Sequence, residues 1–160
     1  MDAALLDRFV LLEGFSEDQV EFLSPIMVRV ECHAGQTVFE QGARAEYLYF
    51  VIEGRVSIQF KPEDGPVLNV ANLEEGGVFG WSSALGSTCY TSSAICMEES
   101  LFVKVSGEDL KTLCQEHSET GILILNKLAG VIAQRLRGTH DQVVALLHQG
   151  LNQDEPGGCK

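Results

Sequence analysis

Positive charge is scarce in this chain. Its 160 residues include 11 lysines and arginines against 23 aspartates and glutamates, which gives a formal net charge of -12 at pH 7. A surface of that sign repels the phosphates of nucleic acids and anionic lipids alike. The composition therefore argues against direct binding of this chain to nucleic acid or to a membrane surface.

The chain also lacks a long, uninterrupted apolar run. Its most apolar stretch, residues 121–132, is broken by Asn126 and Lys127. Asp2 and Asp7 lie where a secretion signal would carry positive charge. We expect a protein without a membrane segment that stays in the cytoplasm.

Paired cysteines and clustered histidines are missing as well. The five cysteines are scattered without a CxxC pair, which predicts reduced thiols in a chain with no export signal. Cys32 and His33 are adjacent, but no second pair follows at the spacing of zinc ligands. No spacing of Ser, His and Asp indicates a nucleophile. We expect neither a metal site nor an enzyme.

Hydrophobic patterning divides the chain into four parts. The β region consists of short alternating runs with turn signals about every 8 to 12 residues, the rhythm of a sandwich or jelly roll. Ser16 and Gln19 match a capping box before it, and Ser106 starts a helix after it. The parts are an N-terminal helical segment, the β region, C-terminal helices and a disordered tail, over residues 1–27, 28–105, 106–150 and 151–160.

The last predicted helix is long for so small a β region. From about Glu119, apolar residues recur every three or four positions as far as Leu147, and a helix of about 30 residues is roughly 45 Å long. We expect its far half, from about Gly138 to Leu151, to pair with the same helix of a second copy in a homodimer. The alternative is that this half folds back as an extra core helix.

A segment rich in glycine and hydroxyl side chains lies near the end of the β region. Residues 76–94 read GGVFGWSSALGSTCYTSSA, which is typical of a loop that enters a short helix and offers backbone amides to an anion. The segment contains no Arg, Lys or Glu. It therefore predicts an anion site that lacks charged side chains.

The β region resembles the cyclic-nucleotide-binding domain of the catabolite activator and protein kinase A regulatory-subunit superfamily. The match is carried by Gly35, Gly42, Leu48 and the Glu53-Gly54 turn in AGQTVFEQGARAEYLYFVIEGRVSIQF. The resemblance covers about Phe15 to Thr139. It implies a mainly β fold with flanking helices, a double-stranded β-helix (jelly roll) that holds a phosphate-binding cassette at 76–94, followed by a long C-terminal helix.

The cassette departs from the family pattern at both polar anchors. In the family, a Glu after Phe-Gly binds the ribose hydroxyl and a later Arg binds the cyclic phosphate. Phe79 and Gly80 match, but Trp81 stands at the Glu position, and alignment without gaps places Tyr90 at the Arg position. The missing arginine removes a hydrogen bond worth about 1.5–3 kcal/mol, and an indole can fill the space of a ribose. We expect no standard binding of cyclic AMP.

The backbone part of the cassette is kept and can still offer donors to a neutral or weakly anionic ligand. Arg44, Arg55 and Lys61 are candidates to replace the missing arginine, although each is more simply a solvated residue. The resemblance implies that Thr139 contacts the nucleotide base, although a solvent-exposed helix threonine is the simpler interpretation. The candidate ligand contacts are Phe79, Gly80, Trp81, Ser82, Ser83, Tyr90, Thr91, Ser92 and Thr139.

Two functions remain open at this point. The first is a regulatory or sensor module that binds a small ligand, either a cyclic nucleotide in a non-standard pose or another molecule. The second is a protein-interaction module whose pocket is filled by Trp81 and Tyr90. In both cases the partner is a second copy or another regulatory protein, and no cofactor is expected. A transcription factor is not expected, because only about ten residues follow the long helix and no helix-turn-helix fits there.

Overall fold

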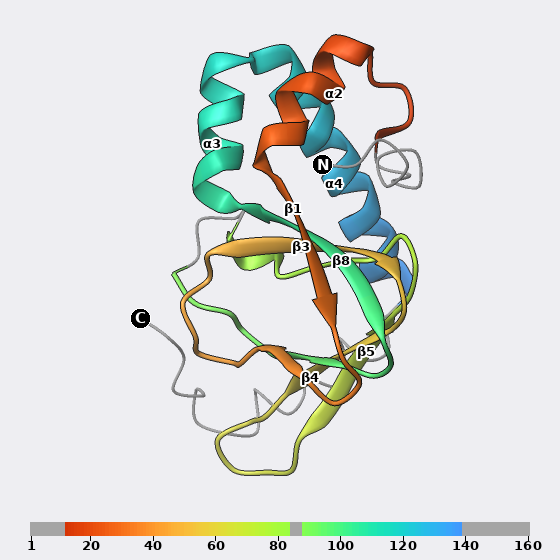
Figure 1. The fold of residues 1–160 in the computed structure, drawn as a ribbon. Helices are drawn as coiled ribbons and strands as arrows, with labels where there is room; N and C mark the ends of the chain where they lie inside the picture. The colour runs from red at the N-terminus through yellow and green to blue at the C-terminus, as the bar shows by residue number, and fades with distance from the viewer. Residues whose placement is uncertain (1–11, 84–87, 139–160) are drawn as a thin grey trace.

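The computed structural model describes residues 12–83 and 88–138, apart from the side chains of 132 and 135–138. Two antiparallel sheets of four strands each form a β roll, and the helices gather at one end of it (Figure 1). This arrangement confirms the mainly β fold with flanking helices that the sequence predicts.

Except for one hairpin in the second sheet, consecutive strands along the chain lie in different sheets. The first sheet, which we call the helix-side sheet, runs in the order β1 (Met27–Cys32), β8 (Ser100–Ser106), β3 (Tyr47–Glu53), β6 (Val78–Phe79). The second runs in the order β2 (Thr37–Phe39), β7 (Ser93–Cys96), β4 (Val56–Phe60), β5 (Leu68–Leu73).

Strand β3 is buried on both faces, which explains its nearly continuous apolar sequence YLYFVIE. Leu48 and Phe50 belong to a core between the sheet and the helices. Tyr49 and Val51 alternate with them and belong to a second core inside the roll. The helix-side sheet is therefore the wall between two hydrophobic cores.

The helices begin at the caps that the sequence predicts. Ser16 and Gln19 form the reciprocal capping box of α2 (Glu17–Leu23), which continues into the short 3-10 helix η2 (Ser24–Ile26). The Ser106 hydroxyl accepts a hydrogen bond from the backbone of Asp109 at the start of α3 (Gly107–Glu116). Both caps satisfy amides that have no partner within the helix.

Helix α4 (Ser118–Gly138) closes the helical end of the molecule. It buries Ile124 and Leu128 against the helix-side core. The far half of the predicted long helix, from residue 139 on, lies outside the described residues, and so does the predicted tail. No helix within the described ranges is both long and apolar enough to cross a membrane.

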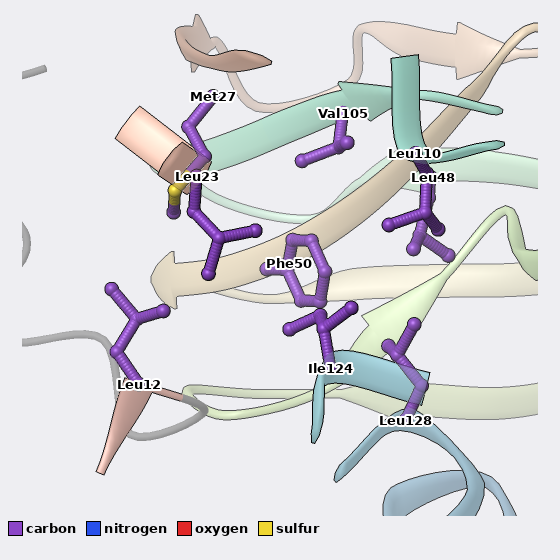
Figure 2. A pocket seen from close by; sticks show the side chains of 9 residues that line it. All are labelled: Leu12, Leu23, Met27, Leu48, Phe50, Val105, Leu110, Ile124 and Leu128. Atoms are coloured by element: carbon purple, nitrogen blue, oxygen red, sulfur yellow. The ribbon is translucent and has the colours of Figure 1, made fainter. Parts of the chain in front are cut away.

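An apolar cavity lies between the helices and the helix-side sheet. Figure 2 shows Phe50 near its centre, with Leu23 from α2 and Ile124 from α4 around it. All nine lining side chains are hydrophobic: Leu12, Leu23, Met27, Leu48, Phe50, Val105, Leu110, Ile124 and Leu128. Such a lining offers nothing to the phosphate or the ribose of a nucleotide, so this cavity is not the predicted cassette site.

The cysteines follow the sequence prediction only in part. Cys32, Cys96 and Cys114 carry free thiols, as predicted. Burial raises the pKa of the Cys32 thiol to about 11, which keeps it protonated. Cys89 is disulfide-bonded, so the prediction of reduced thiols is wrong for this residue.

Replacing Gly54 with alanine should destabilise the fold strongly. Gly54 has a φ of +101°, and a Cβ atom there would lie 2.7 Å from the Cα of Ser100 and would also clash with the Ser100 hydroxyl. We expect a loss of about 3 kcal/mol or more, because strained backbone and a steric clash add. Chemical denaturation measures this loss in the free energy of unfolding, provided that the variant and the wild type share the same m-value.

Gly42 supplies the matched control for this change. Its φ is +86°, but nothing lies within 4 Å of a Cβ built there. Gly42→Ala should therefore cost only the backbone strain, about 1 kcal/mol. Equal losses for the two variants would contradict the close approach of Gly54 to β8.

Candidate functional site

The predicted cassette begins on a strand and leaves it through a tight turn. Val78 and Phe79 form β6 and pair with β3, and Gly80 follows with a φ of +74°. The 3-10 helix η3 (Trp81–Ser83) comes next, and residues 84–87 lie outside the described part. The sequence expectation of a loop that enters a short helical turn holds for this first half.

Gly80 brings the backbone of the cassette directly against strand β3. A Cβ at this position would lie 2.9 Å from the carbonyl oxygen of Tyr47 and 3.2 Å from the ring of Tyr49. Together with the positive φ, this leaves room only for glycine. The start of the cassette is thus fixed against the two tyrosines.

Trp81 points toward the helices. Its half-buried side chain packs against the core between the helix-side sheet and the helices. The sequence left its orientation open, with the ribose position inside the pocket as one possibility. The structure packs the indole against the core under the helices, and not against the core inside the roll.

Tyr90 is held inside the fold by its hydroxyl and its ring. The hydroxyl accepts a hydrogen bond from the Tyr47 amide at 3.0 Å and donates one to the Tyr47 carbonyl at 2.7 Å. Its ring stacks on Phe39 with 3.7 Å between centroids, and the side chain is only 5% exposed. Burial raises the pKa of the Tyr90 phenol. The residue at the predicted arginine position is therefore neutral and already hydrogen-bonded.

The hydroxyls of the cassette differ in what they bind. The Ser83 hydroxyl donates to the carbonyl of Gly80 at 3.1 Å, which closes the short helical turn on itself. Ser82 and Ser92 are half-buried, and Thr91 is exposed. Thr139 lies outside the described residues. The structure thus brings Gly80 and Tyr90 together at Tyr47, whereas Trp81 lies on the other face of the sheet.

The cations proposed as substitutes for the missing arginine have other partners. Arg44 pairs with Glu46 at 3.5 Å, and Arg55 pairs with Glu74 at 3.1 Å. Lys61 donates to the carbonyl of a nearby loop glycine at 3.4 Å. All three are exposed side chains in strands or loops, which agrees with the simpler interpretation of them.

Sequence reasoning missed two side chains that lie beside the cassette. The ammonium of Lys104 lies 4.1 Å from the centroid of the Tyr47 ring, a cation–π contact. Tyr49 stacks on Phe79 at 5.0 Å and is 7% exposed. The alternation of β8 could have indicated Lys104, because it places this residue on the same face as the buried Phe102.

The cassette also touches the beginning of the helical end. A Cβ at Gly107, the first residue of α3, would lie 2.7 Å from the carbonyl oxygen of Ser83. The Gly107 amide donates to the carbonyl of Glu46, just before β3, at 2.9 Å. The backbone at the end of η3 therefore lies directly against the start of α3. No group of three or more metal-ligating side chains occurs within the described residues.

Residues 29–117 match the model of the cyclic nucleotide-binding domain family. The match covers more than half of the chain, so the chain belongs to this family.

Relatives of known function match the chain over part of their length. It is 27% identical over 143 residues to the CRP-like cAMP-activated global transcriptional regulator of Mycobacterium tuberculosis, covering 89% of this chain and 62% of that protein. It is 28% identical over 112 residues to lysophospholipase nte1 of Neurospora crassa, covering 70% of this chain but 7% of that protein. A match confined to 7% of the lysophospholipase carries no enzymatic activity over to this chain.

Solved structures agree on the fold. A putative cyclic nucleotide-binding protein from Geobacter metallireducens superimposes with a TM-score of 0.73 at 22% identity, covering 85% of this chain and 99% of that one. The catabolite activator protein of Thermus thermophilus gives a TM-score of 0.68 at 27% identity, and the superposition covers 86% of this chain and 62% of that one.

Removing the Tyr90 hydroxyl should destabilise the protein. Tyr90→Phe leaves the amide and the carbonyl of Tyr47 without their partner, and we expect a loss of about 1–3 kcal/mol in the free energy of unfolding. Denaturant titration measures the loss. Tyr49→Phe is the matched control, since its hydroxyl makes no hydrogen bond within the described residues and its removal should cost nearly nothing. A Tyr90→Phe variant as stable as the wild type would contradict a structural role for this hydroxyl.

Proposed function

We propose that this chain is a regulatory or sensor module of the cyclic nucleotide-binding domain family that does not bind cyclic AMP in the standard way. The proposal rests on one observation, that the Tyr90 side chain is uncharged and already hydrogen-bonded within the protein. Tyr90 stands at the expected arginine position, its hydroxyl is bonded to the Tyr47 backbone, and it has no charge to offer a cyclic phosphate. A phosphate placed there loses the charge-assisted contact on which the family's cassette depends.

The second anchor supports the same proposal. Trp81 stands at the position of the ribose-binding glutamate, and its indole packs on the helix-side core. It provides no carboxylate to accept hydrogen bonds from ribose hydroxyls. Both polar anchors for a cyclic nucleotide are therefore replaced by side chains that pack into the protein.

The contact between cassette and helices supports a regulatory role. The backbones of Ser83 and Gly107 are in close contact, so a shift of η3 toward α3 would require α3 to move as well. A ligand or partner that prefers one position of η3 therefore shifts the population of helix positions, and this shift changes what the helices present to a partner.

The second candidate is a protein-interaction module without a ligand. Its support is the stacking of Tyr90 on Phe39, which is the packing expected of a self-filled pocket. In this version the module acts through its helices or its acidic surface. The net charge of -12 favours a protein partner over nucleic acid for both candidates.

We also propose that α4 pairs with a second copy in a homodimer. Opposite the residues that it buries, the helix exposes Ile122 to 59%, Leu125 to 43% and also Ala129. These positions are spaced by three and four residues and form one apolar stripe. The same stripe on a second copy is the simplest surface to cover it, because an isologous contact pairs like with like.

Calorimetric titration with cyclic AMP and cyclic GMP tests the ligand proposal. We expect no micromolar binding of either nucleotide to the wild type. The double variant Trp81→Glu/Tyr90→Arg restores both anchors and should gain at least about tenfold in affinity for cyclic AMP, since each charge-assisted hydrogen bond contributes about 1.5–3 kcal/mol.

Two results would count against this account. Micromolar binding of cyclic AMP to the wild type would overturn the proposal of a non-standard site. A double variant that folds, as judged by circular dichroism, but gains no affinity would show that the pocket shape differs as well as its anchors.

The dimer proposal predicts that charge on the exposed stripe of α4 produces monomers. Ile122→Glu/Leu125→Glu places two like charges on each side of the contact, so sedimentation equilibrium should show a shift from dimer to monomer. Glu108→Gln/Asp109→Asn on exposed α3 positions is a control outside the stripe and should remain dimeric. A wild type that is monomeric at about 100 µM would refute the proposal. A dissociation constant above that concentration corresponds to a binding free energy weaker than about 5.5 kcal/mol.

A further inference from the structure

The cysteines of the chain fall into two classes. Cys32, Cys96 and Cys114 carry free thiols, whereas Cys89 is disulfide-bonded. The sequence contains one further cysteine, Cys159, which lies outside the described residues. Because the other three thiols are free, Cys159 is the one cysteine of the same chain that can supply the second sulfur of this disulfide.

The backbone around Cys89 is held in place on both sides. Cys89 itself forms a β-bridge with Arg44. The residues before and after it, Thr88 and Tyr90, form backbone hydrogen bonds of 2.9 Å with the segment 42–45. Cys89 is therefore a fixed attachment point near the end of the cassette, directly before the anchored Tyr90.

Cys89 also differs from the free cysteines in its access to solvent. Cys89 is half-buried, whereas Cys32 and Cys96 are only 3% and 1% exposed. Cys114 is half-buried as well, but α4 packs on it, since a Cβ on Gly121 would lie 2.8 Å from its Sγ. Thiol–disulfide exchange requires access to the sulfur. Among these four cysteines, Cys89 is therefore the one best placed to exchange with a small thiol.

The segment that carries Cys159 is long enough to reach this attachment point. Helix α4 ends at Gly138, and a stretch of about 20 extended residues spans up to about 70 Å. With the expected helix continued as far as Leu151, the reach is still about 45 Å. A domain of 160 residues has a radius of gyration of about 15 Å. The length of the segment therefore does not prevent a bond between the two sulfurs.

The two hydrophobic cores do not depend on a disulfide. Cys32 and Cys96 belong to the core inside the roll as free thiols, and the core under the helices contains no cysteine among the described residues. Buried structural disulfides resist reduction, whereas exposed ones are labile and commonly regulatory. A bond from the half-buried Cys89 to a segment that ends in Gly-Gly-Cys-Lys therefore belongs to the labile kind.

We propose that Cys89 and Cys159 of the same chain form a reversible disulfide that ties the C-terminal segment to the end of the cassette. In the oxidised form, the segment that follows α4 is held beside Tyr90 and Arg44. In the reduced form, the same segment is free to contact a partner. The inference goes beyond the proposed function, because it does not depend on whether the cassette binds a ligand.

A low-molecular-weight disulfide such as oxidised glutathione is the oxidant in this proposal. One cysteine loses its proton, and its thiolate attacks a glutathione sulfur, which forms a mixed disulfide and releases one glutathione thiolate. The second cysteine thiolate attacks the protein sulfur of that mixed disulfide and releases the other glutathione thiolate. The two glutathione thiolates take up the two protons. The protein is thereby oxidised by two electrons, and one oxidised glutathione is reduced to two thiols.

Peptide mapping of the full chain tests the tether. The protein is equilibrated with oxidised glutathione, unfolded and alkylated with iodoacetamide, and then digested with chymotrypsin without reduction. Cleavage after Tyr90 separates Cys89 from Cys96, so each linked peptide identifies its cysteines. We expect a linked pair that contains Cys89 and Cys159, from a chain that migrates as a monomer in a non-reducing gel. Dithiothreitol should release the two peptides.

A titration with mixtures of reduced and oxidised glutathione measures how readily the bond forms. The closing step is intramolecular, so half of the protein should be oxidised where the squared concentration of reduced glutathione divided by that of the oxidised form is on the order of 1 mM. This value is the effective concentration of two groups joined by a short flexible link. A midpoint below about 10 µM would contradict a tether within one chain.

Serine variants assign the two sulfurs. Cys89→Ser and Cys159→Ser should each abolish the cross-link, because each removes one of its sulfurs. Cys114→Ser makes the same change at a half-buried free thiol on α3 and should keep both the cross-link and its midpoint. Circular dichroism checks the fold of every variant. Cys159→Ser keeps the test decisive even where Cys89→Ser fails to fold.

Several results would overturn the inference. They are the absence of a cross-link at saturating oxidised glutathione, a disulfide between two copies of the chain, and a Cys89 that stays bonded to glutathione. A bond from Cys89 to any cysteine other than Cys159 would refute it too. The cyclic AMP titration is a separate measurement, so a failure of the proposed function and a failure of the tether are told apart.

Discussion

The rest of the structure depends on strand β3, which is buried on both faces. Its even-numbered side chains complete the core under the helices, and its odd-numbered side chains line the inside of the roll. Because the side-chain period of a strand is two, a slip by one residue would exchange the two sets and disrupt both cores. The register of β3 with β8 and β6 therefore fixes the helices on one side and the cassette on the other.

Tyr47, at the beginning of this strand, is where the parts of the candidate site meet. Its backbone holds the Tyr90 hydroxyl, its carbonyl lies against Gly80, and its ring carries Lys104. These contacts come from three other segments of the chain. A substitution in any of these segments therefore alters a contact of Tyr47, so its effect on packing cannot be told from an effect on binding by its location alone.

Local sequence signals predicted most of the fold. The capping box at Ser16, the cap at Ser106 and the glycine turn after Glu53 depend on residues close together in sequence, and the structure contains all three. Tyr90 lies 43 residues from its partner Tyr47, and Lys104 lies still further from Tyr47 along the chain, so no periodicity indicates these contacts. The side on which Trp81 packs was also beyond sequence reasoning, because it is decided by which of two cores has room for an indole.

The proposed replacement of both nucleotide anchors is compatible with an intact fold for a physical reason. In a cyclic nucleotide site, charged anchors face a ligand and contribute little to the cores, so they can be replaced without disturbing the sheets. Here Tyr90 adds two hydrogen bonds and a ring stack to the fold itself. Arginine at this position would give up those contacts, which stabilise the protein by about 1–3 kcal/mol.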